Sequence, residues 1–174
     1  MTGPRRSWIL DLPRFGFGER IVRVRSRDAH KYVESVRGEP SEAPSISWGK
    51  EQSSRYGEDL VGGWLLRHGG LTEGLQKEVQ VSIPEGGNQP RRRVDWLVGR
   101  RIIVEVKTYA QSLLKGANLD NTRQFDDYAR WRDEDAYNRA VLLARVAWSG
   151  NAKIESLFMQ DLKHFEIPVI LFLW

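Results

Sequence analysis

The chain contains no cysteine among its 174 residues. Disulfide frameworks, thiolate zinc sites, iron–sulfur clusters and cysteine nucleophiles are therefore excluded. Histidine is almost as scarce, and His30, His68 and His164 lie far apart in the sequence. This spacing excludes metal sites built on pairs of histidines within one helix or one hairpin.

Long apolar runs are missing as well. The longest, such as Pro168–Trp174, are far too short to cross a bilayer. The first residues include two arginines, but no apolar stretch of signal-peptide length follows them. We therefore expect a cytoplasmic protein without membrane contact. The length is that of one ordinary domain with a single buried core.

The excess of positive charge is small. Lysine and arginine total 27 against 23 aspartates and glutamates, which gives a formal net charge of +4. This balance permits a polyanionic partner without requiring one. Residues 1–56 carry most of the excess, with 11 basic and 7 acidic residues. We expect any electrostatic attraction to a polyanion to begin in this third of the chain.

A run rich in Gly, Pro, Ser and Glu, residues 38–44, predicts a linker. The linker divides an amino-terminal arm, residues 1–44, from a body, residues 45–174. In the arm, apolar and basic residues alternate over Ile21–Arg27, which predicts a strand. That strand would present three arginines in a row on one face: Arg23, Arg25 and Arg27.

Hydrophobic periodicity and turn residues predict an α/β fold in which helices flank a mixed sheet. The arm contributes a strand and a helix, and the body contributes helix, three strands, helix, strand, helix, strand. The expected elements are a strand over Ile21–Arg27, a helix from Asp28 to about Arg37, a helix from Ser53 or Ser54 to Gly69, strands over Leu75–Ile83, Arg93–Val98 and Ile102–Tyr109, a helix from Asp120 or Asn121 to about Arg132, a strand over Ala140–Trp148, a helical segment over Ile154–His164 and a strand over Val169–Leu173.

The strand over Ile102–Tyr109 carries the most informative pattern. Both of its faces are largely apolar, which is typical of a strand covered on each side. Glu105 and Lys107 share one face, about 7 Å apart. Burying two ionised groups costs several kcal/mol each unless they are paired or bind a metal. These two side chains must therefore at least form an ion pair.

Asp95 supplies a second carboxylate on the preceding strand, and the length of the turn decides where it lies. With a two-residue turn, Gly99-Arg100, Asp95 would be opposite Val104 and would face away from Glu105. With a three-residue turn, residues 99–101, Asp95 would lie directly opposite Glu105. Only the longer turn, or a bulge, builds a site.

An Asp followed on the next strand by Glu-x-Lys, after a helix that carries an acid, resembles the PD-(D/E)XK nuclease superfamily with its restriction-endonuclease-like fold. The resemblance covers roughly residues 53–174. Gln124 and Tyr128, spaced i, i+4 on a helix, look like the QxxxY motif of the RecB-like branch. Two positions depart from the pattern: Val94 replaces proline, and Glu105 replaces the Asp that is typical of that branch.

The resemblance implies hydrolysis of phosphodiester bonds with Mg²⁺, for which Mn²⁺ would substitute. Asp95, Glu105 and the backbone carbonyl of Val106 would be metal ligands, and Lys107 would orient the attacking water and offset phosphate charge. Glu58 would contact the metal through water, and Gln124 and Tyr128 would complete the catalytic set. One or two carboxylates that leave positions for water and phosphate suit Mg²⁺.

Six arginines are candidate nucleic-acid contacts. Arg91, Arg92 and Arg93 precede Asp95 and form either a solvated charge run or a set of phosphate contacts. Arg23, Arg25 and Arg27 would either meet phosphates or keep a strand edge soluble.

Three functions remain open at this stage. The first is a nuclease acting on nucleic acid, DNA ahead of RNA. The second is a toxin nuclease directed at DNA or tRNA. The third is a catalytically idle nucleic-acid-binding or assembly subunit. Targeting would come from the arm, from a homodimer or from a protein partner.

Overall fold

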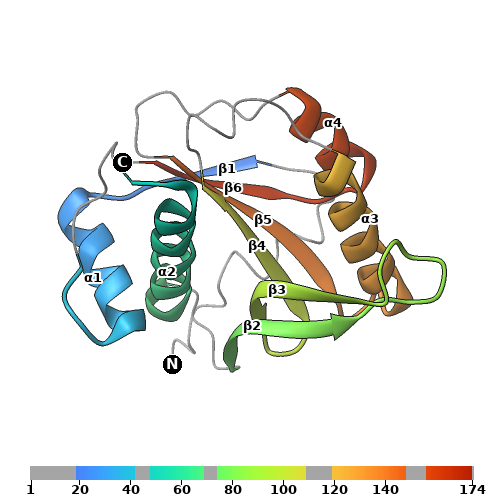
Figure 1. The fold of residues 1–174 in the computed structure, drawn as a ribbon, viewed down its shortest axis with the longest axis horizontal. Helices are drawn as coiled ribbons and strands as arrows, with labels where there is room; N and C mark the ends of the chain where they lie inside the picture. Colours follow the sequence, from blue (N-terminus) through green and yellow to red (C-terminus); the bar gives the residue numbers. More distant parts are fainter. Residues whose placement is uncertain (1–18, 42–47, 69–73, 109–118, 148–155, 174) are drawn as a thin grey trace, which may run out of the picture.

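A computed structural model describes residues 19–41, 48–68, 74–108, 119–147 and 156–173. It contains six strands and four helices in these ranges (Figure 1). In chain order they are β1 (Glu19–Arg23), α1 (Ser26–Arg37), α2 (Lys50–His68), β2 (Leu75–Ser82), β3 (Arg91–Val98), β4 (Ile102–Thr108), α3 (Leu119–Glu134), β5 (Ala140–Ala147), α4 (Ser156–His164) and β6 (Val169–Leu173).

All six strands form one mixed sheet in the order β1-β6-β5-β4-β3-β2. Strands β4, β5, β6 and β1 run parallel, and β2 and β3 are added antiparallel at one edge. The prediction of an α/β fold with a mixed sheet flanked by helices is therefore confirmed. β4 lies inside the sheet, which explains why both of its faces are apolar.

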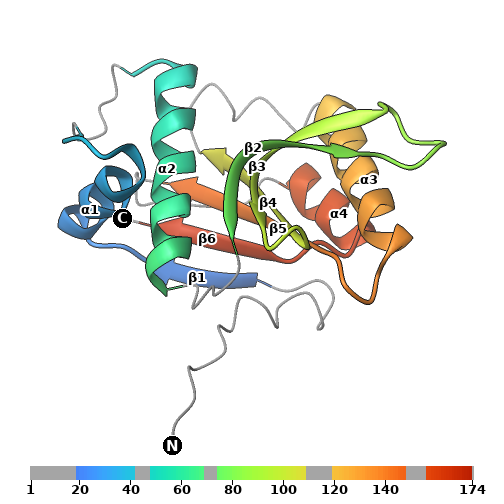
Figure 2. The same cartoon turned by 90° about the horizontal axis from the view of Figure 1, so that it is seen from below.

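Helices cover both faces of the sheet, so the molecule has two cores (Figures 1 and 2). Ile102, Val104 and Val106 of β4 pack in the core with α1 and α2. Ile103 packs in the second core, which contains Phe125 and other residues of α3. The alternation of β4 therefore directs Glu105 and Lys107 to the face covered by α3.

Residues 19–37 are integrated with the rest of the sheet. β1 lies beside β6 in parallel register, and Val33 of α1 packs in the same core as Leu60 and Val61 of α2. The division of the chain at residues 38–44 stays a prediction, and residues 42–47 lie outside the described ranges.

The predicted strand over Ile21–Arg27 is wrong in its extent. β1 ends at Arg23, Arg25 is the N-cap residue of α1, and Arg27 already lies in the helix. Asp28 is in the first turn rather than at the cap, where its charge favours the helix terminus. The three arginines therefore do not form a row along an extended strand.

The other boundaries differ from the predicted ones by a few residues. α2 begins at Lys50, so Ser53 lies within the helix and donates its backbone N–H to the carbonyl of Gly49 at 3.1 Å. Tyr109 and Trp148, predicted as strand residues, lie outside the described ranges. None of the described helices is long and apolar enough to cross a membrane.

Candidate active site

The turn between β3 and β4 fixes the register on which the site depends. Val98 pairs with Ile102 and Trp96 with Val104, so residues 99–101 form a three-residue connection. Gly99 and Arg100 adopt positive φ angles of 57° and 60°, and the N–H of Arg101 donates to the carbonyl of Val98 at 3.0 Å. This register puts Asp95 opposite Glu105, as the longer of the two turns predicts.

The backbone ladder between β3 and β4 ends just before these carboxylates. Trp96↔Val104 is the last pair, and the N–H of Val106 donates instead to Asp95 Oδ2 at 2.7 Å. The Asp95 side chain thus occupies the gap between the two strands. Because N–H and C=O of a strand residue point to the same neighbour, the carbonyl of Val106 is directed toward this gap.

Glu105 is buried and is held from three sides. Tyr128 donates to Glu105 Oε2 at 3.0 Å, and Gln124 donates to Oε1 at 3.2 Å. Lys107 Nζ lies 3.4 Å from the same Oε1 atom. The sequence prediction that Gln124 and Tyr128 share one helix face is confirmed, because Gln124 Nε2 also donates to the Tyr128 hydroxyl at 3.2 Å.

Glu58 reaches the site from α2 on the other side of the sheet. Its carboxyl lies beside that of Asp95, and its negative charge raises the pKa of Asp95. Trp96 Nε1 donates to the backbone carbonyl of Glu58 at 2.8 Å. Close approach of the helix depends on Gly57 and Gly62, since a Cβ at either position would overlap Thr108 or the Trp96 ring.

Asp59, the next residue along α2, does not join these groups. It is buried and forms ion pairs with Arg37 of α1 and Lys77 of β2, each at 2.6 Å. It therefore links three elements: α1, α2 and β2.

Burial and mutual repulsion dominate the electrostatics of the site. Burial, followed by the negative charge of Glu58, raises the pKa of Asp95 to about 7. Burial, followed by the charge of Asp95, raises the pKa of Glu105 to about 7. Burial also raises the pKa of Glu58. Three carboxyls thus share a region in which Lys107 lies beside Glu105 and the charge of Lys77 lowers the pKa of Glu58.

The donor set fits a hard cation bound by few protein ligands. In the described residues, no group of three or more His, Cys, Asp or Glu side chains is arranged as a metal site. A cation here would be held by two carboxylates, a main-chain carbonyl and water, which is how Mg²⁺ is usually bound. Within the described ranges, the buried Oε1 of Gln124 lacks a hydrogen-bond partner, so the site retains an acceptor for a water or another donor.

The six arginines differ in how they are engaged. Arg92 is half-buried and donates to Asp127 Oδ2 at 2.8 Å, so its guanidinium is committed to the fold. Arg93 is exposed and pairs with Glu78 at 2.8 Å. The four others are exposed: Arg23, Arg25, Arg27 and Arg91. A role in nucleic-acid contact stays a prediction for these residues.

Sequence reasoning missed two buried charged residues near the site. Asp127 precedes Tyr128 on α3 and is fully buried. Arg145 of β5 is opposite Lys107 in register and is 2% exposed. A signal for Arg145 was available, because it is the one charged residue in the apolar run Ala140–Ala147.

Comparisons with protein-family models, with curated proteins and with solved structures found no match to this chain.

Proposed function

We propose that the chain is a metal-dependent nuclease that hydrolyses phosphodiester bonds, with DNA as substrate ahead of RNA, and that it belongs with the PD-(D/E)XK enzymes. The observation that carries the proposal is the three-residue turn, which sets Asp95 opposite Glu105 where the strand ladder ends. Lys107 lies beside Glu105 on the same face.

The distribution of charge supports the same conclusion. Acids in a protein interior are normally stabilised by cations or hydrogen-bond donors. Burial and a neighbouring carboxylate nevertheless raise two pKa values to about 7 here: Glu58 acts on Asp95, and Asp95 acts on Glu105. A purely structural site would lose little by replacing such a cluster with apolar residues. Retaining it is understandable if a divalent cation completes the charge balance.

Each residue would then have a defined task. Asp95, Glu105 and the carbonyl of Val106 would hold Mg²⁺ or Mn²⁺, with Glu58 reaching it through water. The bound ion would supply Lewis-acid stabilisation of charge on the phosphate and would acidify water. Lys107 would orient the nucleophilic water and offset phosphate charge. Tyr128 and Gln124 would keep the Glu105 carboxylate in one orientation through their hydrogen bonds.

A plasmid-nicking assay tests the proposal directly. Purified full-length protein should nick supercoiled DNA with Mg²⁺ or Mn²⁺, but not with EDTA or with Ca²⁺ alone, because Ca²⁺ prefers longer bonds and activates water poorly. Asp95→Asn, Glu105→Gln and Lys107→Ala should each abolish nicking. Glu134→Gln, an exposed carboxylate at the end of α3, is the matched control and should retain it.

Two outcomes would contradict the proposal. One is nicking that persists in EDTA with the Lys107→Ala protein. The other is metal-dependent nicking that survives Glu105→Gln at the wild-type rate. Nucleic-acid binding without any cleavage would favour the idle binding subunit.

A further inference from the structure

The two strands that carry the candidate ligands are not joined by backbone hydrogen bonds at the site. Their ladder ends at Trp96↔Val104, one residue short of Asp95 and Glu105. A sheet ladder normally fixes the spacing of neighbouring strands at about 4.8 Å. Beyond its end, the hydrogen bond from the Val106 N–H to Asp95 Oδ2 is the direct link between β3 and β4 that the described residues provide, which leaves room for another element to contribute to the separation of the two carboxylates.

Helix α3 makes a further bridge between the two strands. Through Tyr128 it contacts both strands, since the hydroxyl lies 3.0 Å from Glu105 Oε2 and 3.4 Å from the backbone carbonyl of Arg93. Through the preceding residue, Asp127, it holds the β2–β3 hairpin. Adjacent side chains of one helix thus contact β4 and the hairpin that contains Asp95.

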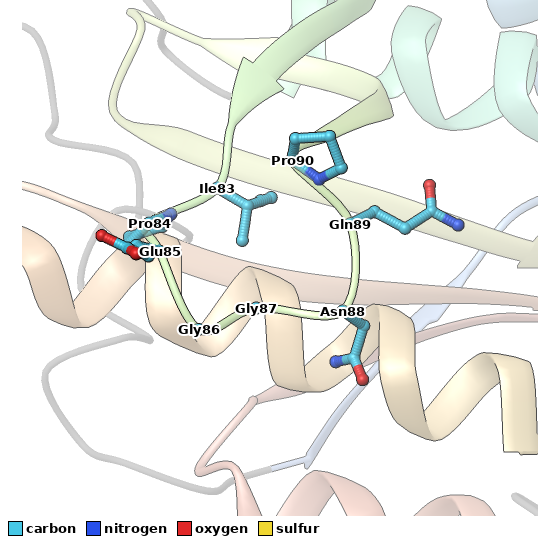
Figure 3. A pocket seen from close by; sticks show the side chains of 8 residues that line it. All are labelled: Ile83, Pro84, Glu85, Gly86, Gly87, Asn88, Gln89 and Pro90. Carbon is cyan, nitrogen blue, oxygen red and sulfur yellow. The ribbon is translucent and has the colours of Figure 1, made fainter.

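Asp127 binds the tip of this hairpin with every acceptor position it has. Its Oδ1 accepts from the backbone N–H of Asn88 at 2.6 Å and from Asn88 Nδ2 at 3.0 Å. Its Oδ2 accepts from the backbone N–H of Gln89 at 3.2 Å and from Arg92 Nε at 2.8 Å. Residues 83–90 line an open hollow as the tip crosses α3 (Figure 3).

The carboxylate form is the one that this network requires. Burial alone would raise the pKa of Asp127, but the hydrogen bonds from Asn88 and Arg92 outweigh it and lower the pKa. An asparagine of the same shape would lose the charge and turn one acceptor into a donor facing N–H groups. Asp127→Asn is therefore a small change that should release the hairpin tip.

We propose that Asp127 is a positioning residue that sets the separation of Asp95 and Glu105 by clamping the β2–β3 hairpin to α3. The inference rests on the proposed function, because it concerns the geometry of the same metal site. Its consequence is that a residue which touches neither metal nor substrate controls metal affinity. Partners that orient ligands commonly change metal affinity by about ten- to a hundredfold.

The test is isothermal titration calorimetry, in which Mn²⁺ is titrated into the full-length protein without nucleic acid. Asp127→Asn should raise the dissociation constant for Mn²⁺ by about tenfold or more, while the number of binding sites stays close to one per chain. The milder variants Arg92→Gln and Asn88→Ala should also raise the dissociation constant for Mn²⁺. Asp161→Asn is the matched control, because it removes the charge of the acceptor that α4 offers to the Thr122 hydroxyl of α3 and leaves the clamp intact.

The number of sites separates positioning from mere folding. If Asp127 served only stability, its variants would lower the number of binding sites without changing the dissociation constant, and the inference would be overturned. An unchanged dissociation constant in all three clamp variants would overturn it as well. A wild-type chain that neither binds Mn²⁺ nor cleaves DNA would instead overturn the proposed function.

Discussion

Two groups of buried carboxylates in this molecule have opposite surroundings. Asp127 accepts four hydrogen bonds, including one from Arg92, and its pKa is lowered. Glu105 is buried and Asp95 is half-buried, and their pKa values are raised to about 7. Asp127, like the ion-paired Asp59, belongs to a balanced group, in which donors and cations of the chain keep the charge. Glu105 keeps a raised pKa although Lys107, Tyr128 and Gln124 lie beside it. On the proposed function, the contrast separates acids that hold the fold together from acids that would bind the metal.

The comparison is sharpest for the replacement of one acid from each group. Glu105→Gln should lower the nicking rate by roughly a thousandfold or more, because several kcal/mol of transition-state stabilisation depend on the bound ion. Its thermal transition should stay in place or rise, since the change removes a repulsive buried charge. Asp127→Asn should instead lower the stability by about 2–4 kcal/mol. Scanning calorimetry and nicking assays on both variants check whether one loses activity while the other loses stability.

A reversed pattern would break the comparison. If Glu105→Gln unfolded the protein while Asp127→Asn left its melting temperature unchanged, the central carboxylates would be structural. Asp59→Asn offers a second control from the balanced group, because Asp59 is paired with Arg37 and Lys77. It should lower stability without abolishing cleavage.

The two groups should also respond to pH in opposite directions. The raised pKa values of Asp95 and Glu105 mean that the folded chain binds more protons than the unfolded one between about pH 4 and pH 7. Stability is therefore lost as the pH rises through about 7. We expect metal-free protein to lose ~2 kcal/mol, or roughly 4–8 °C in Tm, between pH 5 and pH 8.

Scanning calorimetry in EDTA measures this slope. The double variant Asp95→Asn/Glu105→Gln should lose less stability between pH 5 and pH 8. Without EDTA, added Mn²⁺ at pH 8 should give the wild-type protein back its lost stability, because the cation replaces the protons on the two carboxyls. Asp127 has the opposite sign, because its lowered pKa gives stability that is lost only as the pH falls below the range of an unfolded Asp. A wild-type Tm that rises from pH 5 to pH 8 in EDTA would contradict the assignment.

The sequence predicted much of the sheet because hydrophobic alternation is a local signal. The alternation over Ile102–Thr108 correctly indicated which residues of β4 face each of the two cores. The register of Asp95 remained ambiguous, because a turn of two or three residues suits Gly99 equally well. The end of β1 at Arg23 was missed, since the pattern Val-Arg-Val-Arg continues past the point where α1 begins.

Long-range pairing explains what the sequence could not indicate. Arg91–Arg93 is a uniform basic run, yet Arg92 is bound to Asp127, which is 35 residues away. Likewise, Glu58 and Asp59 are neighbours on α2, but one reaches Asp95 and the other binds Arg37 and Lys77. Such choices depend on tertiary distances that no local pattern encodes.

The position of Glu58 depends on how α2 packs against β4. A change in this packing should affect stability and cleavage less than the replacement of a site carboxylate. Gly57→Ala should push α2 away from β4, because the new Cβ would overlap Thr108 Oγ1. Overpacking of this kind costs about 1–3 kcal/mol. We expect the apparent Mn²⁺ requirement for nicking to rise at the same time, as Glu58 recedes from Asp95. Gly49→Ala is the matched control, since no atom of a described residue other than its chain neighbours lies within 4 Å of a Cβ there.

A double-mutant cycle identifies the contact. Within the described ranges, buried Thr108 Oγ1 has no hydrogen-bond partner, so Thr108→Ala alone should cost little beyond its methyl group. Combined with Gly57→Ala it should recover part of the lost stability, because the clashing oxygen is gone while Thr108 Cβ remains near. Additive effects of the two changes would exclude this contact as the cause.

The smallest expected effect concerns a carboxylate that belongs to neither group. Glu78 is exposed, adopts a positive φ of 54°, and lies between the pairs Lys77↔Trp96 and Val79↔Val94, which sets it opposite Asp95. A left-handed conformation costs a non-glycine residue about 1–2 kcal/mol, and an exposed ion pair such as Glu78–Arg93 contributes about 0–1 kcal/mol. Glu78→Gly should therefore be neutral or stabilising by up to about 1 kcal/mol, whereas Glu78→Ala, which removes the same charge but keeps the strain, should not stabilise. Urea unfolding of both variants isolates the backbone contribution, and a Glu78→Gly protein less stable than Glu78→Ala would show that the left-handed backbone at this position carries no cost that glycine relieves.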